Sequence, residues 1–175
     1  MIDTLAIYAA NYLFIVLLAV ALLWYLTRPT EDKLEMIAWG IVALPVMYLL
    51  LIAAGLVYDD PRPFAVGHYT PLIPHDADNG FPSDHTLLCS ATSSIVFFYS
   101  KPMSAVLWLM TLLVGASRVW AGVHHATDIV ASILMAIGVS VLTWKFVVPR
   151  IKETNAFQNF SETVTQLLTR RVKDV

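Results

Sequence analysis

The sequence is short of charge and of cysteine. Only 14% of its 175 residues are charged and 58% are hydrophobic, whereas soluble domains carry about 25% charged and roughly 45–50% apolar residues. With a mean hydropathy of +0.68, the chain is predicted to be a polytopic membrane protein. The single cysteine, Cys89, excludes an intrachain disulfide and any multi-cysteine metal site. A net charge of -2 and the lack of a long basic run give no argument for nucleic acid as a partner.

The hydrophobic residues gather in runs long enough to form membrane helices. At a rise of 1.5 Å per residue, about 20 residues cross a hydrocarbon core of roughly 30 Å. Apolar stretches lie at about residues 5–27, 34–58, 83–100, 102–119 and 126–148. The third and fourth are short, and Pro102 between them predicts a tight helical hairpin. The predicted fold class is all-α, a polytopic integral membrane helical bundle of five to six transmembrane helices.

The two ends of the chain carry further predictions. The first run follows Met-Ile-Asp and exceeds the apolar core of a cleaved signal peptide, so we expect a retained span. Residues 1–150 are predicted to form one transmembrane domain and residues 151–175 an amphipathic cytoplasmic C-terminal helix. That helix lies on the inner leaflet or binds a partner. Its apolar and basic side chains are Phe157, Phe160, Val164, Leu167, Leu168 and Val172, with Arg170, Arg171 and Lys173.

The charges of the loops predict an orientation. Basic residues follow the first, third and fifth apolar stretches, at Arg28, Lys33, Lys101, Lys145, Arg150 and Lys152. The loop after the second stretch has one basic residue, Arg62, and the acidic residues Asp59, Asp60, Asp76 and Asp78. Because basic loops stay on the cytoplasmic side, we expect the N-terminus outside and the C-terminus in the cytoplasm. Residues 59–82 and 118–125 then face outward.

Polar residues that could bind a ligand or take part in catalysis gather at those two loops, which are predicted to face outward. All five histidines fall there or at their borders: His68, His75, His85, His124 and His125. Three motifs accompany them, D-D-P-R-P-F at residues 59–64, P-S-D-H at 82–85 and R-V-W-A-G-V-H-H-A-T-D at 118–128. A charge inside a membrane costs roughly 2.5–3.5 kcal/mol even on a lenient scale, so ionisable residues beside spans are functional candidates.

The first two motifs, together with Arg118 of the third, suit an anion. A helix that starts near Ser83 offers free backbone N–H groups and the positive end of its dipole. Arg62 and Arg118 add guanidinium groups, which match the planar, bidentate geometry of phosphate. These residue types predict a site for a phosphate group.

The remaining polar residues suit proton transfer and nucleophilic attack. If the fifth helix begins around His124, Asp128 lies one turn further on the same face. Its carboxylate would then fix the tautomer of the imidazole and stabilise the imidazolium. His85 is left as a general acid for the departing oxygen.

Together the motifs resemble the type 2 phosphatidic acid phosphatase superfamily, which comprises membrane lipid phosphatases and soluble vanadium haloperoxidases. The resemblance is carried by R-P at 62–63, P-S-D-H at 82–85 and S-R-x5-H-x3-D at 117–128. It implies that His124 attacks phosphorus to form a phosphohistidine, that Asp128 orients His124 and that His85 protonates the leaving group. It also implies that the phosphoryl oxygens are held, without a metal or another cofactor, by Arg62, Ser83 and Arg118.

Two positions depart from the family pattern. Gly55 stands where the family has a lysine seven residues before the arginine, and Asp84 replaces the glycine of P-S-G-H. The wider string I-P-H-D-A-D-N-G-F-P-S-D-H-T at residues 73–86 resembles the bacitracin-resistance branch, the bacterial undecaprenyl-diphosphate phosphatases. That branch implies a role in cell wall biogenesis and antibiotic resistance and a place in the bacterial cell (inner) membrane.

The other polar residues have ordinary structural interpretations. His68 and His75 are expected to be solvated loop residues, and Asp84 a helix-capping residue. His125 is interpreted as a polar loop residue, with a supporting contact to the site as the alternative. The acidic residues of the 59–82 loop are expected to be solvated, although Asp60 or Asp76 could touch a substrate-bound cation.

The predicted function is a membrane lipid phosphatase with its site on the outer face. The preferred reaction converts undecaprenyl diphosphate to undecaprenyl phosphate and phosphate through a phosphohistidine. A phosphatidylglycerophosphate or phosphatidate phosphatase of the same superfamily is the alternative, and a metal-dependent membrane hydrolase or a transporter is more remote. The expected partners are a polyprenyl or glycerophospholipid phosphate substrate and membrane lipids, and not nucleic acid.

Overall fold

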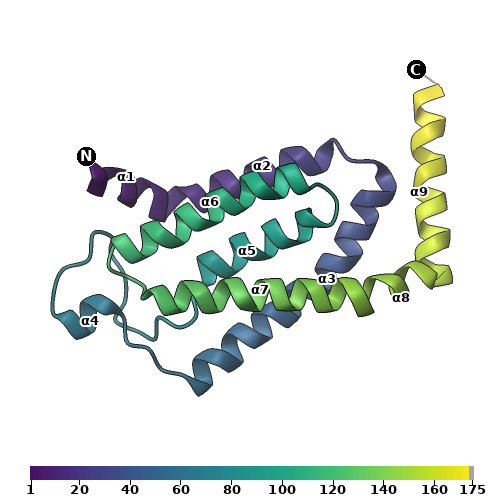
Figure 1. The fold of residues 1–175 in the computed structure, drawn as a ribbon. Coiled ribbons are helices and arrows are strands. Elements are labelled where there is room, and N and C mark those ends of the chain that lie inside the picture. Colours follow the sequence, from purple (N-terminus) through teal and green to yellow (C-terminus); the bar gives the residue numbers. More distant parts are fainter. Residues whose placement is uncertain (174–175) are drawn as a thin grey trace.

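The computed structural model describes residues 1–173, with side chains up to residue 167. Within that range the chain forms helices joined by loops, and Pro61 pairs with Asn79 in one isolated antiparallel bridge. The elements are α1 Ile2–Tyr8, the π-helix η1 Ala9–Leu13, α2 Phe14–Leu26, α3 Thr30–Val57, α4 Pro63–Gly67, α5 Asp84–Phe97, α6 Lys101–Trp120, α7 Ala126–Phe146, α8 Val148–Glu153 and α9 Asn155–Lys173. Figure 1 shows α5 between α6 and α7, with α4 and its loops at one end of the bundle and α9 at the other. The predicted all-α membrane bundle is confirmed.

Each predicted apolar stretch corresponds to a helix in the structure. By length and composition, the described residues include four membrane-span candidates: Ile2–Leu26, Thr30–Val57, Lys101–Trp120 and Ala126–Glu153. The first joins α1, η1 and α2 into one stretch of 25 residues. Many of their large apolar side chains are exposed on the surface of the bundle, where a membrane protein meets lipid.

The third stretch forms the short central helix α5. It has 14 residues, a length of about 21 Å at 1.5 Å per residue. The helix packs against both α6 and α7 and buries side chains from its first turn to its last: Thr86, Leu87, Cys89, Ser90, Ala91, Ser93, Ser94 and Val96. It ends at Phe97, three residues before the predicted boundary, because residues 98–100 form the turn into α6.

The predicted hairpin of α5 and α6 is confirmed, and hydroxyl groups link its two helices. The side chains of Ser93 and Thr111 share a hydrogen bond of 2.9 Å, and Ser104 Oγ donates to the Ser93 carbonyl at 2.8 Å. Pro102 lies in the first turn of α6, where its missing N–H leaves no helical bond unmade. Such small hydroxyl side chains allow close helix packing in membranes and satisfy each other across it.

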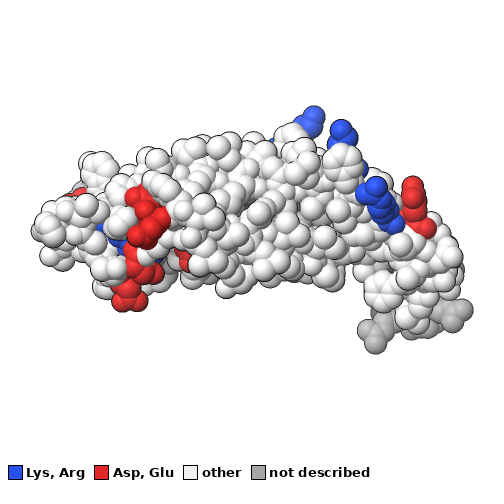
Figure 2. Space-filling model, turned by 90° about the horizontal axis from the view of Figure 1, so that it is seen from below, with Lys and Arg blue, Asp and Glu red and all other residues white. Residues whose placement is uncertain are grey.

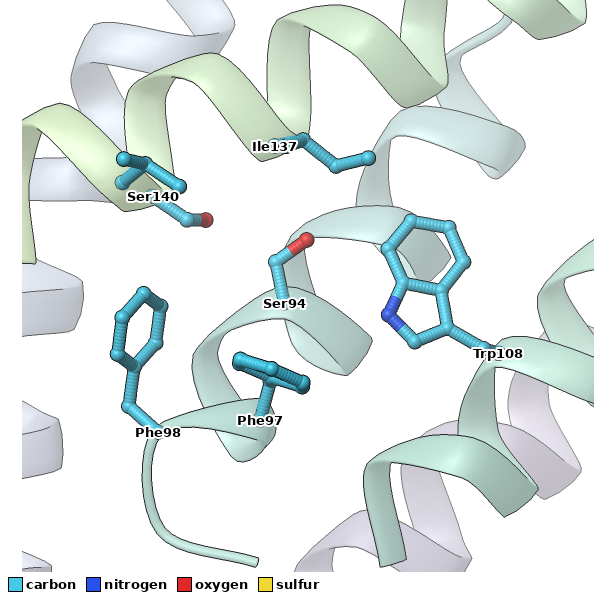
Figure 3. A pocket seen from close by; sticks show the side chains of 7 residues that line it. Ser94, Phe97, Phe98, Trp108, Ile137 and Ser140 are labelled. Carbon is cyan, nitrogen blue, oxygen red and sulfur yellow. The ribbon is translucent and has the colours of Figure 1, made fainter. Parts of the chain in front are cut away.

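The end of the bundle far from α4 is aromatic. Trp39 of α3 donates from Nε1 to Thr143 Oγ1 of α7 at 2.7 Å and packs against Phe98 and Trp144. Beside this cluster lies a cavity of about 220 Å³. Figure 3 shows the rings of Phe97, Phe98 and Trp108 around it, between α5, α6 and α7. These residues lie at the opposite end of α5 from His85, so the cavity is remote from the predicted chemistry.

The last spanning helix, α7, begins at Ala126, the first residue of the predicted 126–148 stretch, and His125 is its N-cap. The pairing of His124 with Asp128 was argued for a helix that begins around His124, but His124 lies in the preceding loop. The C-terminal segment is helical from Asn155 to Lys173 and packs beside α3 and α8. Its place on the inner leaflet stays a prediction. The side chains of several residues named for it lie outside the described range: Leu168, Arg170, Arg171, Val172 and Lys173.

The two ends of the bundle differ in charge. Figure 2 shows acidic side chains gathered at the end that holds α4, and basic side chains near the opposite end. The acidic end includes Asp59, Asp60, Asp76 and Asp78, whereas the basic residues of the loops and helix ends are Arg28, Lys33, Lys101, Lys145, Arg150 and Lys152. This distribution in space matches the asymmetry on which the predicted orientation rests.

Candidate active site

The residues predicted to do chemistry come from separate elements that meet at the α4 end of the bundle. Arg62 precedes α4, Ser83 caps α5, Arg118 is in the last turn of α6 and Asp128 is in the first turn of α7. Their burial is unusual for polar groups: Arg62 is 6% exposed, Arg118 3%, His124 2% and Asp128 0%. Buried charges persist only when they are paired or bind a ligand, so this end of the bundle is the candidate site.

His124 and Asp128 form a buried pair. His124 Nδ1 lies 3.1 Å from Asp128 Oδ2, which also accepts the backbone N–H of His125 at 2.9 Å. Because an ionised carboxylate only accepts hydrogen bonds, the ring proton is on Nδ1 and the lone pair is on Nε2. The tight loop that holds His124 includes Gly122 with φ +77°, a conformation that glycine adopts without strain. The predicted pairing is therefore present although His124 lies outside the helix.

The environment keeps His124 neutral. Burial lowers the pKa of its imidazole below the ordinary 6.5, and the charges of Arg118 and Arg62 lower it further. The hydrogen bond to Asp128 acts in the opposite direction. A neutral ring with its lone pair on Nε2 is the form that a nucleophile needs.

Arg62 holds this loop in place. Its Nη1 donates to the Val123 carbonyl at 2.9 Å and lies 3.4 Å from His124 Nε2. Its Nε donates to Asp78 Oδ1 at 2.6 Å, and this hydrogen bond lowers the pKa of Asp78. The arginine thus places a positive charge directly beside the nitrogen that carries the lone pair.

Ser83 joins α5 to α7 at the site. Its Oγ donates to Thr86 Oγ1 at 3.1 Å and accepts from the Thr86 N–H at 3.5 Å, as expected of an N-cap. Its backbone N–H donates to the Asp128 carbonyl at 3.5 Å, and Ser132 Oγ donates to the Ser83 carbonyl at 2.8 Å. The positive end of the α5 dipole is thereby fixed next to Asp128.

His85 lies in a second histidine–aspartate pair. Its Nδ1 is 2.9 Å from Asp84 Oδ1, and the ring packs edge-on against Phe14 at a centroid distance of 4.6 Å. Asp84 also accepts the His85 backbone N–H at 2.8 Å, so this residue orients the ring, whereas the N-cap of α5 is Ser83 and not Asp84 as expected. Within the described residues, His85 makes no hydrogen bond to Arg62, His124 or Asp128.

His75 was expected to be a solvated loop residue, and that expectation is wrong. Its Nε2 lies 3.2 Å from Arg118 Nη2, and its ring centroid is 6.4 Å from that of His124. His68, on the same loop, is exposed as expected. The contact joins residues 43 positions apart. The sequence signals for a role of His75 were the clustering of the histidines and its place in the 73–86 string.

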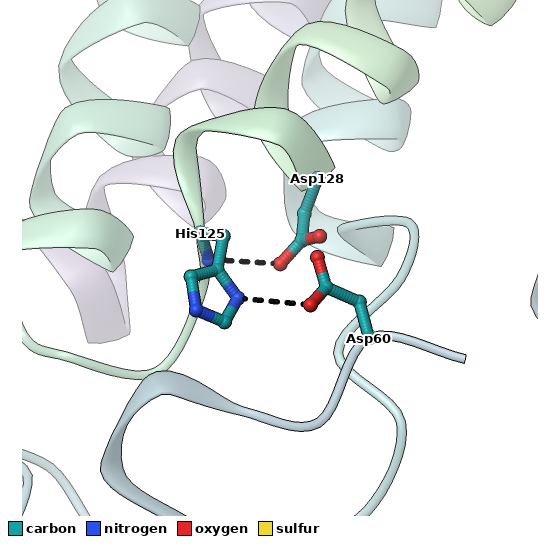
Figure 4. A group of neighbouring side chains, drawn as sticks. All are labelled: Asp60, His125 and Asp128. Atoms are coloured by element: carbon teal, nitrogen blue, oxygen red, sulfur yellow. Dashed lines mark hydrogen bonds and ion pairs between the residues drawn. The ribbon is translucent and has the colours of Figure 1, made fainter. Parts of the chain in front are cut away.

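Figure 4 shows a further group of neighbouring side chains, those of Asp60, His125 and Asp128. His125 Nδ1 lies 3.3 Å from Asp60 Oδ1. With Asp128, these residues offer ligand atoms that all lie within 4.8 Å of one another. Asp128 Oδ2 already accepts two N–H groups, whereas its buried Oδ1 has no hydrogen-bond partner within the described range. The donor set suits a divalent cation, and the metal-dependent alternative would use it.

Two glycines explain how closely the loop packs. A Cβ on Gly80 would lie 3.3 Å from Asp128 Oδ2, so a side chain there would press on the carboxylate that pairs with His124. A Cβ on Gly55 would lie 3.1 Å from the Phe81 carbonyl. Asn79 donates to the Gly55 carbonyl at 3.0 Å. The space where the family has a lysine side chain is thus bordered by the loop that leads into P-S-D-H.

An apolar groove on the side of the bundle reaches the first turn of α5. It has a volume of about 300 Å³ and is lined by Leu44, Met47, Tyr48, Leu51, Asp84, Leu87, Leu88 and Ala91. The groove runs between α3 and α5, and Asp84, which pairs with His85, is its one charged residue. It therefore connects the lipid-facing surface with the polar end of α5.

Comparison with known proteins agrees with this geometry. The sequence pattern of the PAP2 superfamily matches residues 9–152. Undecaprenyl-diphosphatase BcrC of Bacillus subtilis is 32% identical over 147 residues, which cover 82% of this chain and 74% of the relative. The bacitracin transport permease protein BcrC of Bacillus licheniformis is 29% identical over 167 residues, 95% of this chain and 81% of the relative.

Solved structures share the fold. The crystal structure of LpxE from Aquifex aeolicus has a TM-score of 0.67 and 24% sequence identity, over 83% of this chain and 86% of the other. A transmembrane PAP2-type phosphatidylglycerolphosphate phosphatase from Bacillus subtilis has a TM-score of 0.60 and 20% identity, over 88% and 79%. The chain therefore belongs to the PAP2 superfamily, as an integral membrane phosphatase.

Proposed function

We propose that this chain hydrolyses undecaprenyl diphosphate to undecaprenyl phosphate and inorganic phosphate. The observation that carries the proposal is the buried pair of His124 and Asp128, with His124 Nε2 beside Arg62. The diphosphate is preferred because a phosphate is a better leaving group than an alkoxide. The curated relative from Bacillus subtilis, which is named an undecaprenyl-diphosphatase, supports the same choice.

The reaction proceeds in two displacements. In the first, Nε2 of His124 attacks the terminal phosphorus, the bond from that phosphorus to the bridging oxygen breaks, and His85 protonates the departing lipid phosphate. In the second, His85 takes a proton from water, the hydroxide attacks the phosphohistidine, and phosphate leaves. Because Nδ1 of each histidine faces a carboxylate, both rings present Nε2 to the reaction.

Charge stabilisation comes from fixed cationic groups. Arg62, Arg118 and the N-terminus of α5 hold the phosphoryl oxygens, with Ser83 fixing that helix end. Arg118 supports this role because its buried Nε has no hydrogen-bond partner within the described range. Preorganised donors in a buried site stabilise the charge of the transferring group more strongly than water does.

The lipid part of the substrate lies in the groove between α3 and α5. The groove is apolar along its length and has Asp84 at its polar end, so a prenyl chain stays in the bilayer while its headgroup enters the site. The acidic end of the bundle faces outward and the C-terminal helix stays in the cytoplasm, by the positive-inside rule. We place the protein in the bacterial cell (inner) membrane, with residues 1–150 as the catalytic domain and residues 151–175 as a helix on the inner leaflet.

Phosphate release from purified protein tests the proposal. The panel contains undecaprenyl diphosphate, undecaprenyl phosphate, phosphatidylglycerophosphate and phosphatidate. We expect the diphosphate to have the highest kcat/KM and His124→Ala to release no phosphate while keeping its unfolding temperature. A higher kcat/KM for a glycerophospholipid would favour the alternative function, and turnover by His124→Ala would contradict the mechanism.

The cluster of Asp60, His125 and Asp128 makes a metal-dependent hydrolase the second candidate. The two mechanisms differ in their response to chelation. The histidine mechanism predicts full phosphate release after exhaustive treatment with a chelator. Loss of release that a divalent cation restores would establish the metal-dependent mechanism instead.

A further inference from the structure

His75 is a third histidine at the site, and it lies outside the three motifs that carry the superfamily resemblance, within the 73–86 string. Its loop is fixed on both sides of the ring. On one side, Leu72 N–H donates to the Ala121 carbonyl at 3.0 Å, and Ile73 is 3% exposed in a cluster with Ala121 and Val123. On the other side, Asp78 pairs with Arg62 at 2.6 Å. The position of the ring is therefore built into the fold.

The contact with Arg118 fixes the protonation of the ring. A guanidinium has no acceptor, so His75 Nε2 must offer its lone pair to Arg118 Nη2 across the 3.2 Å contact. The proton is then on Nδ1, which donates to the Asp76 carbonyl at 3.4 Å. His75 is thus neutral here, with an acceptor atom in a place lined by cations.

The surroundings of the ring explain this state. Four charged or titratable groups face the ring of His75. They are Arg62 before α4, Arg118 on α6, His124 in the loop before α7, and Asp78 on the same loop as His75. Burial and the two arginines lower the pKa of His75. A phosphoryl group bound between these cations adds negative charge and reverses their effect, which favours the imidazolium.

We propose that His75 is a phosphate-binding residue that takes up a proton when the phosphoryl group binds. The proton comes from solvent and is added to Nε2, which changes from an acceptor for Arg118 to a donor toward a phosphoryl oxygen. Arg118 Nη2 loses its hydrogen bond to His75 at the same time and donates to the bound phosphoryl group instead. This inference rests on the proposed function only in that the bound group is the phosphoryl group of the substrate.

The proposal also accounts for the positive charge that is missing at Gly55 of α3, where the family has a lysine. A side chain at Gly55 would meet the Phe81 carbonyl at 3.1 Å, so that side of the site is closed by its own loop. The same loop carries His75 beside Arg118. A positive charge therefore arises from the loop only while a phosphoryl group is bound.

Binding of inorganic orthophosphate and orthovanadate to the purified full chain tests this role. The variants are His75→Gln, which keeps an acceptor for Arg118 but cannot become charged, and His68→Asn as the control. His68 is exposed on the same loop with φ +51°, and asparagine tolerates that conformation. Calorimetry at pH 6, in buffers with different ionisation enthalpies, gives the affinity and the number of protons taken up.

We expect His75→Gln to bind phosphate roughly tenfold or more weakly at pH 6, the size of a lost hydrogen bond to a charged group. Its proton uptake should fall, and its affinity should approach that of the wild type above pH 8. His68→Asn should match the wild type throughout. Wild-type affinity and proton uptake in His75→Gln, or a loss that is equal at every pH, would overturn the proposal.

This experiment separates the inference from the proposed function. Phosphate binding that depends on His75, in a protein that releases no phosphate from undecaprenyl diphosphate, would leave the inference standing and reject that substrate. Hydrolysis of undecaprenyl diphosphate with an unchanged KM in His75→Gln would support the proposed function and reject the role of His75.

Discussion

At the residue scale, the buried carboxylate of Asp128 has two structural roles. It accepts Nδ1–H of His124 and the backbone N–H of His125, so it fixes both a tautomer and a loop. Asp128→Asn should lower kcat by roughly 10³–10⁴-fold, because an amide permits the wrong tautomer and removes the charge that stabilises the imidazolium. The measurement is phosphate release at saturating lipid. Asp59→Asn, an exposed carboxylate on the 59–82 loop, is the control and should retain the wild-type rate.

The lowered pKa of His124 predicts the dependence of activity on pH. The nucleophile must be neutral, so kcat/KM is retained as the pH falls through 6.5 and is lost only below that ordinary value. The measurement is the pH profile of kcat/KM in the His75→Gln variant, in which protonation of His75 cannot contribute to the acid limb. An acid limb centred above pH 6.5 would mean that Asp128, and not burial, decides the protonation of His124.

The sequence predicted the residues of local pairs better than those of distant ones. The spacing of His124 and Asp128 predicted their contact, which forms even though the helix begins two residues after His124. By contrast, His75 meets Arg118 across 43 residues, and Asp78 meets Arg62 across 16. These contacts depend on the path of the 68–82 loop, which hydrophobic periodicity does not describe. The roles assigned to the site residues remain predictions.

At the scale of elements, the groove between α3 and α5 predicts how the lipid chain is selected. Leu44 lines the groove and Leu49 lies on the same helix outside it. Leu44→Trp should raise KM for undecaprenyl diphosphate several-fold and leave KM for a short, water-soluble isoprenyl diphosphate unchanged, because only the long chain needs the groove. Leu49→Trp should change neither value. An equal change of KM in the two variants would mean that the lipid chain binds outside the groove.

The hydropathy of the sequence predicted the helices because long apolar runs leave a membrane chain few alternatives. It did not predict that α5 ends at Phe97, since that boundary depends on the turn at residues 98–100 and on the Ser100 cap of α6. Nor did it predict the hydroxyl contacts between Ser93, Ser104 and Thr111. Those contacts require the register of two helices, which is a property of their packing.

At the scale of the whole molecule, the unequal charge of the two ends predicts which end faces outward. Cys89 is buried, so an introduced cysteine can be labelled selectively. A membrane-impermeant maleimide added to intact cells should label Ala77→Cys, in the 59–82 loop that is predicted to face outward, and not Lys101→Cys, at the start of α6. Both variants should react after the cells are lysed. The reverse pattern before lysis would mean that the site faces the cytoplasm.

The short central helix also has a consequence for the substrate. Figure 1 shows α5 beginning deeper in the bundle than the facing ends of α6 and α7. Its 14 residues cover about 21 Å of a hydrocarbon core of roughly 30 Å. If the proposed substrate binds at the start of α5, the length of this helix sets how far its headgroup must enter the bundle, in steps of about 5.4 Å per turn. We therefore expect that a lipid whose headgroup is already held by a soluble molecule is not hydrolysed.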